Sequence, residues 1–257
     1  MRCISARFVS RLLSDDQKAL CVSVCRELKQ QARDDSNFIS DIITGVETWV
    51  YGYDPETKQQ SSLWKSPNSP RLKKTRQFRS NVKSMLIVFY DIHGIDHKEF
   101  VTPGQTVNGK FYCEVLKRLR ESIWRKCPDK WKKNNWFLQH DNAPAHTSFV
   151  VRKFLTSKNI TVIPHPPYLP DHAPCNFFLS PKMKLWLKGR CFDMTEGIHT
   201  ETQEVIDTLI FENFQGCMKS WETCGDRCMV EMVETRSYGK KLFLWPNSPN
   251  FWVAPRI

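Results

Sequence analysis

The chain has 257 residues and a net charge of +11, with 40% hydrophobic and 25% charged residues. This composition is typical of a globular protein with room for a full core, and no apolar run approaches the ~18 residues that cross a membrane. The basic excess favours a polyanionic partner such as nucleic acid, but a generally basic protein without such a partner accounts for the charge equally well.

The first thirteen residues are rich in arginine and contain no acid, a composition that mitochondrial transit peptides share. The next segment begins with Ser14 and has Gln17 three positions later, which is the pattern of a helix capping box. It predicts a helix that runs to about Gln31 and carries an apolar stripe.

Strands and helices follow along the rest of the chain. Segments rich in β-branched and aromatic residues predict strands, and segments with apolar residues three or four positions apart predict helices. The expected strands are 38–53, a short returning strand at 61–64, 84–91, 95–101, 136–140 and 161–163. The expected helices are one capped by Asn108, then 147–157, 175–187, 195–211 and 214–228. This order favours an α/β fold, a mixed sheet with helices on both faces.

The ten cysteines include no C-x-x-C pair, and no secretory signal precedes them. We therefore expect reduced thiols rather than disulfides. Cys217, Cys224 and Cys228 lie close together near the C-terminal end, but no histidine follows His199 to complete a zinc site there. The sequence thus argues against structural zinc at this trio.

Three positions stand out for their surroundings. Asp141 ends an apolar run and precedes a turn, where an aspartate commonly caps the turn that follows. Asn176 comes 35 positions later, after a stiff loop with five prolines and near the expected start of a helix, where asparagine commonly satisfies backbone donors. Val46 lies between Gly45 and Glu47 in the first expected strand.

These segments resemble the catalytic domain of mariner-type transposases of the Tc1/mariner superfamily. The resemblance runs from about Ile4 to Cys228, and the motifs that carry it occur in the family order at 44–45, 49–50, 103–106, 140–143, 146–148 and 164–176. The family has an aspartate at each of three points, and only Asp141 matches. Val46 and Asn176 stand at the other two. The resemblance implies an RNase H-like fold with a mixed five-stranded sheet.

In this family the three acids hold Mg²⁺ or Mn²⁺, which neutralise charge on the attacking and leaving oxygens during DNA strand transfer. The resemblance implies that Asp141 and Asn176 are the remaining catalytic and metal-binding positions, whereas Val46 offers no ligand. Glu47 is not expected to replace Val46, because successive strand side chains point to opposite faces. We expect cation binding to be weakened or lost and strand cleavage to be absent or residual.

Between Thr57 and Tyr90 the chain has eight basic residues and no acidic one. In the family this region carries a clamp loop that reaches the partner protomer and helps to hold DNA. The resemblance implies non-specific DNA binding and a homodimer formed through the linker and the clamp loop, with a flexible, solvated loop as the alternative. The candidate DNA-binding residues are Lys65, Arg71, Lys73, Lys74, Arg76, Arg79 and Lys83.

We expect three parts: a linker and helix at 1–36, the catalytic domain at 37–228, and an unrelated, poorly ordered tail at 229–257 that resembles the translation of a shifted reading frame. The linker interpretation is preferred to a transit peptide. The family's helix-turn-helix units precede this linker, so recognition of transposon ends is expected to be missing. The favoured function is a transposon-derived, nuclear DNA-binding protein defective in strand cleavage and transfer. The alternatives are a non-enzymatic dimeric interaction module and a relic with no selected function.

Overall fold

The structure is a computed structural model that describes residues 13–56, 60–62, 64–66, 69–70, 73, 77–133, 136–166, 169 and 172–234. Its five strands form one mixed sheet in the order β3-β2-β1-β4-β5. The strands are β1 (Ile42–Tyr51), β2 (Lys83–Tyr90), β3 (Ile95–Val101), β4 (Phe137–Gln139) and β5 (Thr161–Val162). The pairs β1–β2 and β2–β3 are antiparallel, and β1–β4 and β4–β5 are parallel. The expected mixed five-stranded sheet is therefore present.

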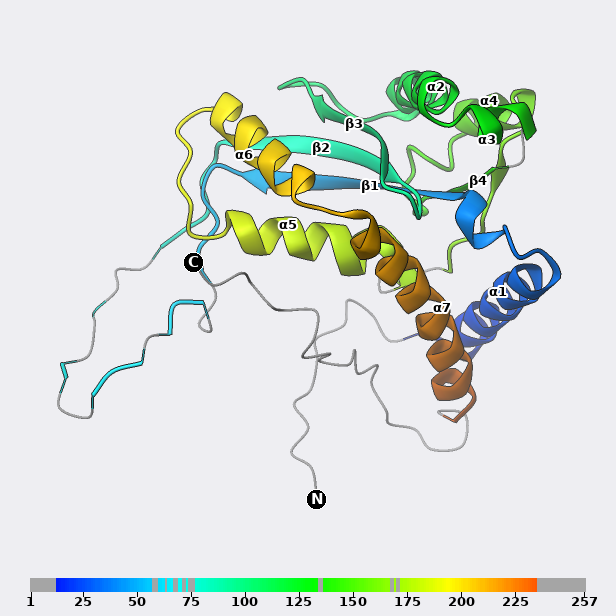
Figure 1. Cartoon of the computed structure of the whole chain (residues 1–257), viewed down its shortest axis with the longest axis horizontal. Coiled ribbons are helices and arrows are strands. Elements are labelled where there is room, and N and C mark those ends of the chain that lie inside the picture. Colours follow the sequence, from blue (N-terminus) through cyan, green and yellow to red (C-terminus); the bar gives the residue numbers. More distant parts are fainter. Residues whose placement is uncertain are drawn as a thin grey trace.

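Helices cover both faces of this sheet (Figure 1). They are α1 (Asp15–Asp34), α2 (Gly109–Lys126), α3 (Pro128–Lys133), α4 (Phe149–Ser157), α5 (Ser180–Leu187), α6 (Thr195–Asp207) and α7 (Phe211–Glu234), with short turns at η1 (Ile39–Asp41) and η3 (Cys175–Leu179). The helices α2 and α4 lie on one face, and α5 and α6 lie on the other. None of the helices in the described part of the chain is long and apolar enough to span a membrane.

Two predicted helix starts are confirmed. The Ser14 side chain accepts from the backbone N–H of Gln17 at 3.3 Å, and the Gln17 side chain accepts from the Ser14 N–H at 3.0 Å, which completes the capping box of α1. At α2, Asn108 Oδ1 accepts from the Phe111 N–H at 3.0 Å. Each cap satisfies backbone donors that a helix start otherwise leaves without partners.

One predicted strand is wrong. The described residues of the segment 61–64 form a turn and irregular backbone, not a returning strand. The segment is short and opens with Ser61 and Ser62, so it has too few apolar side chains to be buried against the sheet. The expected helix at 214–228 begins three residues earlier and continues to Glu234, beyond the boundary expected at residue 228.

Alternation along the strands divides the core into two layers. Ile42, Val88 and Tyr90 pack with η3 and the helices α5 to α7. Ile43 and Phe89, each one residue away from a member of the first group, pack with α2 and α4 on the opposite face. The sheet therefore carries both layers, because successive side chains of a strand point to opposite faces.

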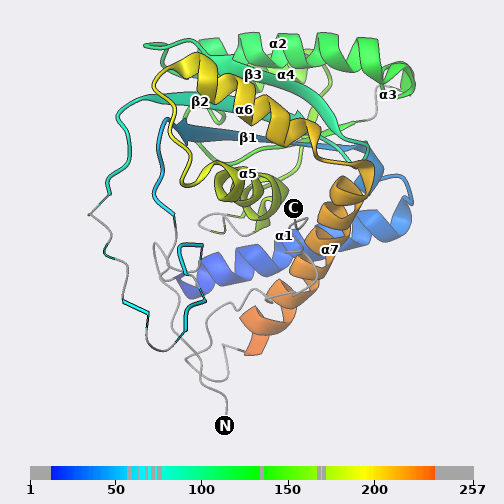
Figure 2. The same ribbon diagram turned by 60° about the vertical axis from the view of Figure 1, so that its left-hand side comes forward.

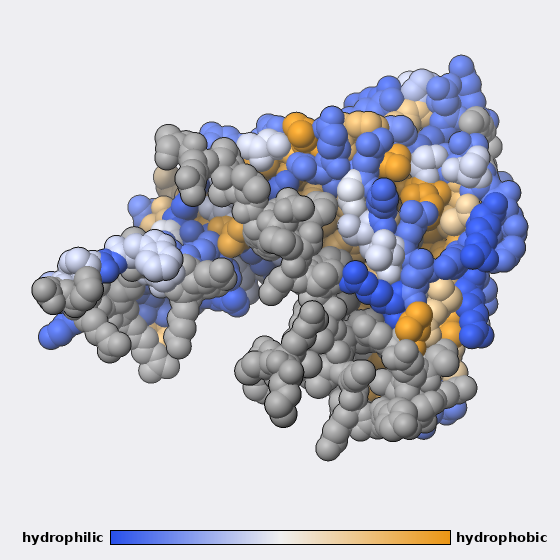
Figure 3. Space-filling view, turned by 60° about the horizontal axis from the view of Figure 1, so that its bottom comes forward, coloured by the Kyte–Doolittle hydropathy of each residue, from blue (hydrophilic) through white to orange (hydrophobic). Residues whose placement is uncertain are grey.

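The first and last described helices pack together at one end of the molecule. Figure 2 shows α1 crossing α7, and Cys21, Cys25 and Cys228 form a small buried cluster between them with Leu169. These three cysteines are free thiols in the structure. On the face shown in Figure 3, the described residues are mostly hydrophilic, with hydrophobic side chains in separate patches.

Candidate functional site

The hydroxyl group of Thr44 joins the three segments that carry the candidate positions. It donates to Gln139 Oε1 on β4 at 2.5 Å and lies 3.3 Å from Cys175 Sγ in η3. Thr44 precedes the first candidate position by two residues, Gln139 precedes the second by two, and Cys175 precedes the third by one. All three linking residues are buried. The fold therefore brings segments that are distant in sequence to one region of the sheet.

Each candidate position presents a different kind of side chain. Val46 is half-buried and packs against the core on the α5–α7 side, where it pairs in register with Val88. Asn176 is half-buried in the first turn of η3, and its backbone N–H donates to Ala173 O at 2.9 Å. The Asp141 side chain follows β4 and is 56% exposed. The three positions thus offer one alkyl group, one amide and one carboxylate.

Asp141 is held by two donors. Its Oδ1 accepts from the backbone N–H of Ala143 at 3.0 Å, which is the expected turn cap, and contacts His146 Nδ1 at 2.7 Å. The pKa of Asp141 is lowered to about 2, first by the hydrogen bond from His146 and then, against the effect of burial, by the Ala143 N–H. Asp141 is therefore a carboxylate that already has a cationic partner.

His146 connects Asp141 to a second carboxylate. Its Nε2 lies 2.8 Å from Glu47 Oε1, while its Nδ1 faces Asp141, and its side chain is 5% exposed. Burial alone lowers the pKa of His146, but the hydrogen bonds to Asp141 and Glu47 outweigh burial and raise the pKa to about 9. At neutral pH the ring is thus an imidazolium that donates from both nitrogens. We call this arrangement the Glu47–His146–Asp141 bridge.

The surroundings of the bridge fix the ring of His146. Tyr112 lies 4.0 Å from it between ring centroids, and His140 stacks on it at 5.0 Å with an interplanar angle of 7°. Burial, and then the neighbouring His146, lower the pKa of His140 to about 3, so His140 is neutral. The Tyr112 hydroxyl lies 3.1 Å from His140 Nδ1. Only one of the two stacked histidines therefore carries a charge.

Sequence reasoning did not find the bridge. Glu47 lies on the face of β1 opposite to Val46, and its carboxylate contacts His146 there. The sequence does contain one half of the bridge, because His146 lies only five residues after Asp141 on the same turn. Two neighbouring carboxylates favour the charged form of a buried histidine. The second carboxylate, Glu47, is 99 residues away in the sequence, however, and only the fold brings it close to His146.

The candidate DNA-binding residues lie in the connection between β1 and β2 or at its end. Lys73 is exposed, and the Lys65 ammonium group donates to Pro70 O at 3.1 Å. Arg79 pairs with Asp54 at 2.7 Å, and Lys83 lies over the Trp49 ring at 4.3 Å. The remaining candidates lie outside the described residues: Arg71, Lys74 and Arg76.

Comparison with known proteins finds relatives in sequence and in structure. A family model described as "Transposase (partial DDE domain)" matches residues 54–133. The Mariner Mos1 transposase of Drosophila mauritiana is 30% identical over 223 residues, which are 85% of this chain and 64% of the relative. The crystal structure of the Mos1 catalytic domain superposes with a TM-score of 0.73 at 26% identity, over 92% of this chain and 100% of that chain. In sequence and in fold, the chain thus matches the catalytic domain of mariner-type transposases.

The match to the mariner catalytic domain establishes the RNase H-like fold. The Mos1 mariner paired end complex with Mn also superposes, with a TM-score of 0.81 at 28% identity, over 90% of this chain and 67% of that chain. This chain spans 64% of the length of the Mos1 transposase, so the activity and partners of a whole mariner transposase do not transfer to it directly.

Proposed function

We propose that this chain is a transposon-derived DNA-binding protein that keeps the mariner-type catalytic fold but is defective in metal-dependent strand cleavage and transfer. The observation that carries the proposal is Val46. Its alkyl side chain packs into the core on β1 at a position where the family has an aspartate.

The residues present do not fit a pair of divalent cations. Two Mg²⁺ or Mn²⁺ ions about 4 Å apart need several oxygen ligands, chiefly carboxylates. Val46 supplies none and Asn176 supplies a neutral amide, which leaves Asp141 as the one carboxylate among the three positions. The His146 imidazolium also neutralises part of the charge that would attract a cation. We therefore derive no cleavage step through a metal ion at this position.

Binding to DNA is supported by the charge and by the connection between β1 and β2. Lys73 and Lys65 are exposed there, and Trp64 and Phe78 are exposed large hydrophobic residues in the same connection. Cations in such a connection contact phosphates, and exposed aromatic rings stack on bases or insert into a partner. The Mos1 relative was solved as a paired end complex, and we propose non-specific DNA binding, a homodimer and a nuclear location for this chain.

The experiment restores the missing acids. The variant with both Val46→Asp and Asn176→Asp is incubated with supercoiled plasmid and Mg²⁺ or Mn²⁺, beside the parent chain. We expect the double variant to nick DNA at least about tenfold faster, which corresponds to about 1.4 kcal/mol of barrier. A third variant that adds Asp141→Asn is the control, and it must lose the gain.

Three outcomes separate the interpretations. Equal nicking by the parent and the double variant contradicts the proposed defect. DNA binding by both chains without nicking by either favours the non-enzymatic interaction module. Absence of DNA binding at low salt by a folded parent chain removes the DNA partner from the proposal.

A further inference from the structure

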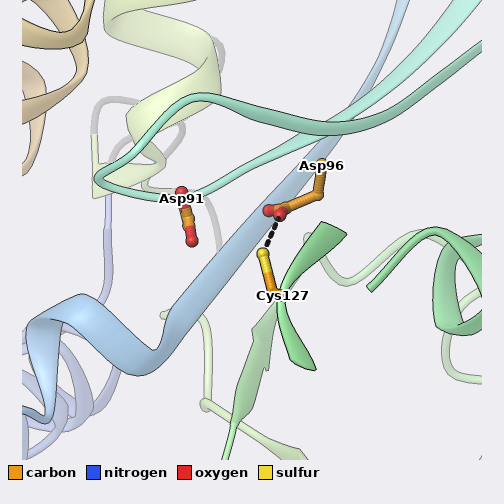
Figure 4. A group of neighbouring side chains, drawn as sticks. All are labelled: Asp91, Asp96 and Cys127. Atoms are coloured by element: carbon orange, nitrogen blue, oxygen red, sulfur yellow. Dashed lines mark hydrogen bonds between the residues drawn. The ribbon is translucent and has the colours of Figure 1, made fainter. Parts of the chain in front are cut away.

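A second group of ligand-type side chains lies at the turn between β2 and β3. Asp91 directly follows β2, Asp96 lies in β3, and Cys127 caps the C-terminal end of α2. Figure 4 shows the three side chains close together, with the Asp96 carboxylate joined to the Cys127 sulfur by a hydrogen bond. One ligand atom from each residue lies within 4.8 Å of the others. The group shares no residue with the Glu47–His146–Asp141 bridge.

Both carboxylates are buried, with 1% of Asp91 and 3% of Asp96 exposed. Asp91 is well supplied with donors. Its Oδ1 accepts from the backbone N–H groups of His93 at 2.7 Å and Gly94 at 3.1 Å, and its Oδ2 accepts from the Lys130 ammonium group. The turn and the start of α3 therefore hold Asp91 in place.

Asp96 lacks such support. Its Oδ1 accepts only the weak hydrogen bond of the Cys127 thiol at 3.7 Å, and its Oδ2 has no hydrogen-bond partner among the described residues. Burial, and then the charge of Asp91, raise the pKa of Asp96 to about 7. A buried carboxylate oxygen without a donor is costly, and a cation between Asp96, Asp91 and Cys127 would satisfy it.

We propose that Asp91, Asp96 and Cys127 bind one divalent cation of the Zn²⁺ class. Two carboxylates and a thiolate form a mixed oxygen and sulfur donor set, which suits Zn²⁺ and disfavours Mg²⁺, a hard ion that requires oxygen ligands. Three protein ligands leave a fourth tetrahedral position for water.

The charges at the group favour a bound cation. Asp91, Asp96 and the Cys127 thiolate carry three negative charges, and the ammonium groups of Lys130 and Lys126 carry two positive charges, so a net negative charge remains to attract a cation. Binding displaces the thiol proton of Cys127 to solvent, and also the proton of Asp96 in the fraction of molecules in which Asp96 is protonated. The ion would then tie the β2–β3 turn to the end of α2, where the Lys126 ammonium group already donates to Asp96 O at 2.9 Å.

Titration with Co²⁺, a spectroscopic substitute for Zn²⁺, tests this site on the full chain. We expect one equivalent to produce the near-ultraviolet charge-transfer absorption of a cobalt–thiolate bond, and Zn²⁺ to abolish it by competition. Cys127→Ser should remove the absorption, and Asp96→Asn should weaken binding at least about tenfold, because it replaces a charged ligand with a neutral one. The matched control is Cys191→Ser, which removes an exposed thiol outside the group and should change nothing.

Asp141→Asn is the second control and should leave the absorption intact, so failure here is distinct from failure of the proposed function. Absence of the band in the parent chain, or its persistence in Cys127→Ser, overturns the proposal and favours a proton shared by the two aspartates. If Cys127→Ser does not fold, alkylation of the parent chain with and without Zn²⁺, followed by peptide mass mapping, tests whether Cys127 binds the ion. Zn²⁺ must then slow modification of Cys127 and leave Cys191 unaffected, and equal modification of Cys127 with and without Zn²⁺ overturns the proposal.

Discussion

Gly45 and Phe89 face each other across the β1–β2 pair so closely that a Cβ atom at Gly45 would lie 2.4 Å from Phe89 Cε1. The Phe89 ring is buried, with 1% of its surface exposed, and cannot move into solvent. Gly45 is therefore required because a side chain there would clash with β2, and not because its backbone conformation is unusual.

Gly45→Ala should consequently destabilise the fold by about 1 to 3 kcal/mol, the usual cost of overpacking a core. Phe89→Leu removes the ring that causes the clash. We expect the double variant to recover part of the loss, which urea unfolding of all four proteins measures as a coupling energy. Additive effects in this double-mutant cycle would contradict the proposed contact.

The Glu47–His146–Asp141 bridge predicts a pH dependence of stability. The pKa of His146 is raised to about 9 in the folded chain, so its contribution is fully present below the unfolded value of about 6.5 and is lost as pH rises through about 9. The pKa of Asp141 is lowered to about 2. Its contribution to the free energy of unfolding is therefore fully present above the unfolded value of about 3.9 and is lost as pH falls through about 2. The bridge should therefore stabilise most between about pH 4 and 6.5.

Comparison of the parent chain with His146→Gln by urea unfolding at pH 6 and pH 10 tests this. The variant should be less stable at pH 6, and the difference should shrink at pH 10, where the parent ring is neutral. The titratable groups facing the ring are His140, Tyr112, Glu47 and Asp141. A constant difference at both pH values would assign the loss to packing rather than to charge.

Restoring the acids should make stability depend on Mg²⁺. Val46→Asp with Asn176→Asp removes apolar packing and adds two negative charges near Asp141, so the melting temperature should fall without a cation. A ligand at 100 times its Kd adds about 2.7 kcal/mol, so saturating Mg²⁺ should raise the melting temperature of the double variant by several degrees. The parent chain should not respond, and an equal response from both chains would contradict the assignment of these positions.

The basic connection between β1 and β2 predicts a salt dependence. If Lys73, Lys74 and Arg76 contact phosphates, their joint replacement by alanine should reduce the slope of log K against log salt by about 2 to 3. The charge-matched control is the triple replacement of Lys117, Arg125 and Lys132, which are exposed on α2 and α3. Fluorescence anisotropy at several salt concentrations gives both slopes. Equal slopes for the two triple variants would contradict a role of the β1–β2 connection in DNA binding.

Local signals in the sequence predicted much of the fold. The capping box at Ser14, the cap at Asn108 and the strand at 95–101 are set by nearby residues, and the structure reproduces them. Helix ends were less accurate: α1 and α7 extend beyond their expected limits, whereas α6 ends at Asp207 instead of residue 211. The short helix α3 at 128–133 was not expected as a separate element.

The candidate site was predictable only in part. Positions Val46, Asp141 and Asn176 follow from the family resemblance, and Thr44 explains how the fold brings their segments together. The bridge through His146 depends on a contact between residues 99 positions apart, which no local pattern reveals. Arg79, one of the candidate DNA-binding residues, forms an ion pair with Asp54, which lies just outside the acid-free stretch.

The packing of α1 against α7 has a consequence for synthesis on the ribosome. The helix α1 buries Cys21, Val22 and Cys25 against a segment of α7, which is made after every other described helix and strand. Until α7 has been made, these apolar side chains of α1 have no native partner. They therefore remain exposed to solvent or bind a chaperone. This end of the molecule can therefore fold only after α7 has been made, whereas the antiparallel strands β1, β2 and β3 can pair earlier.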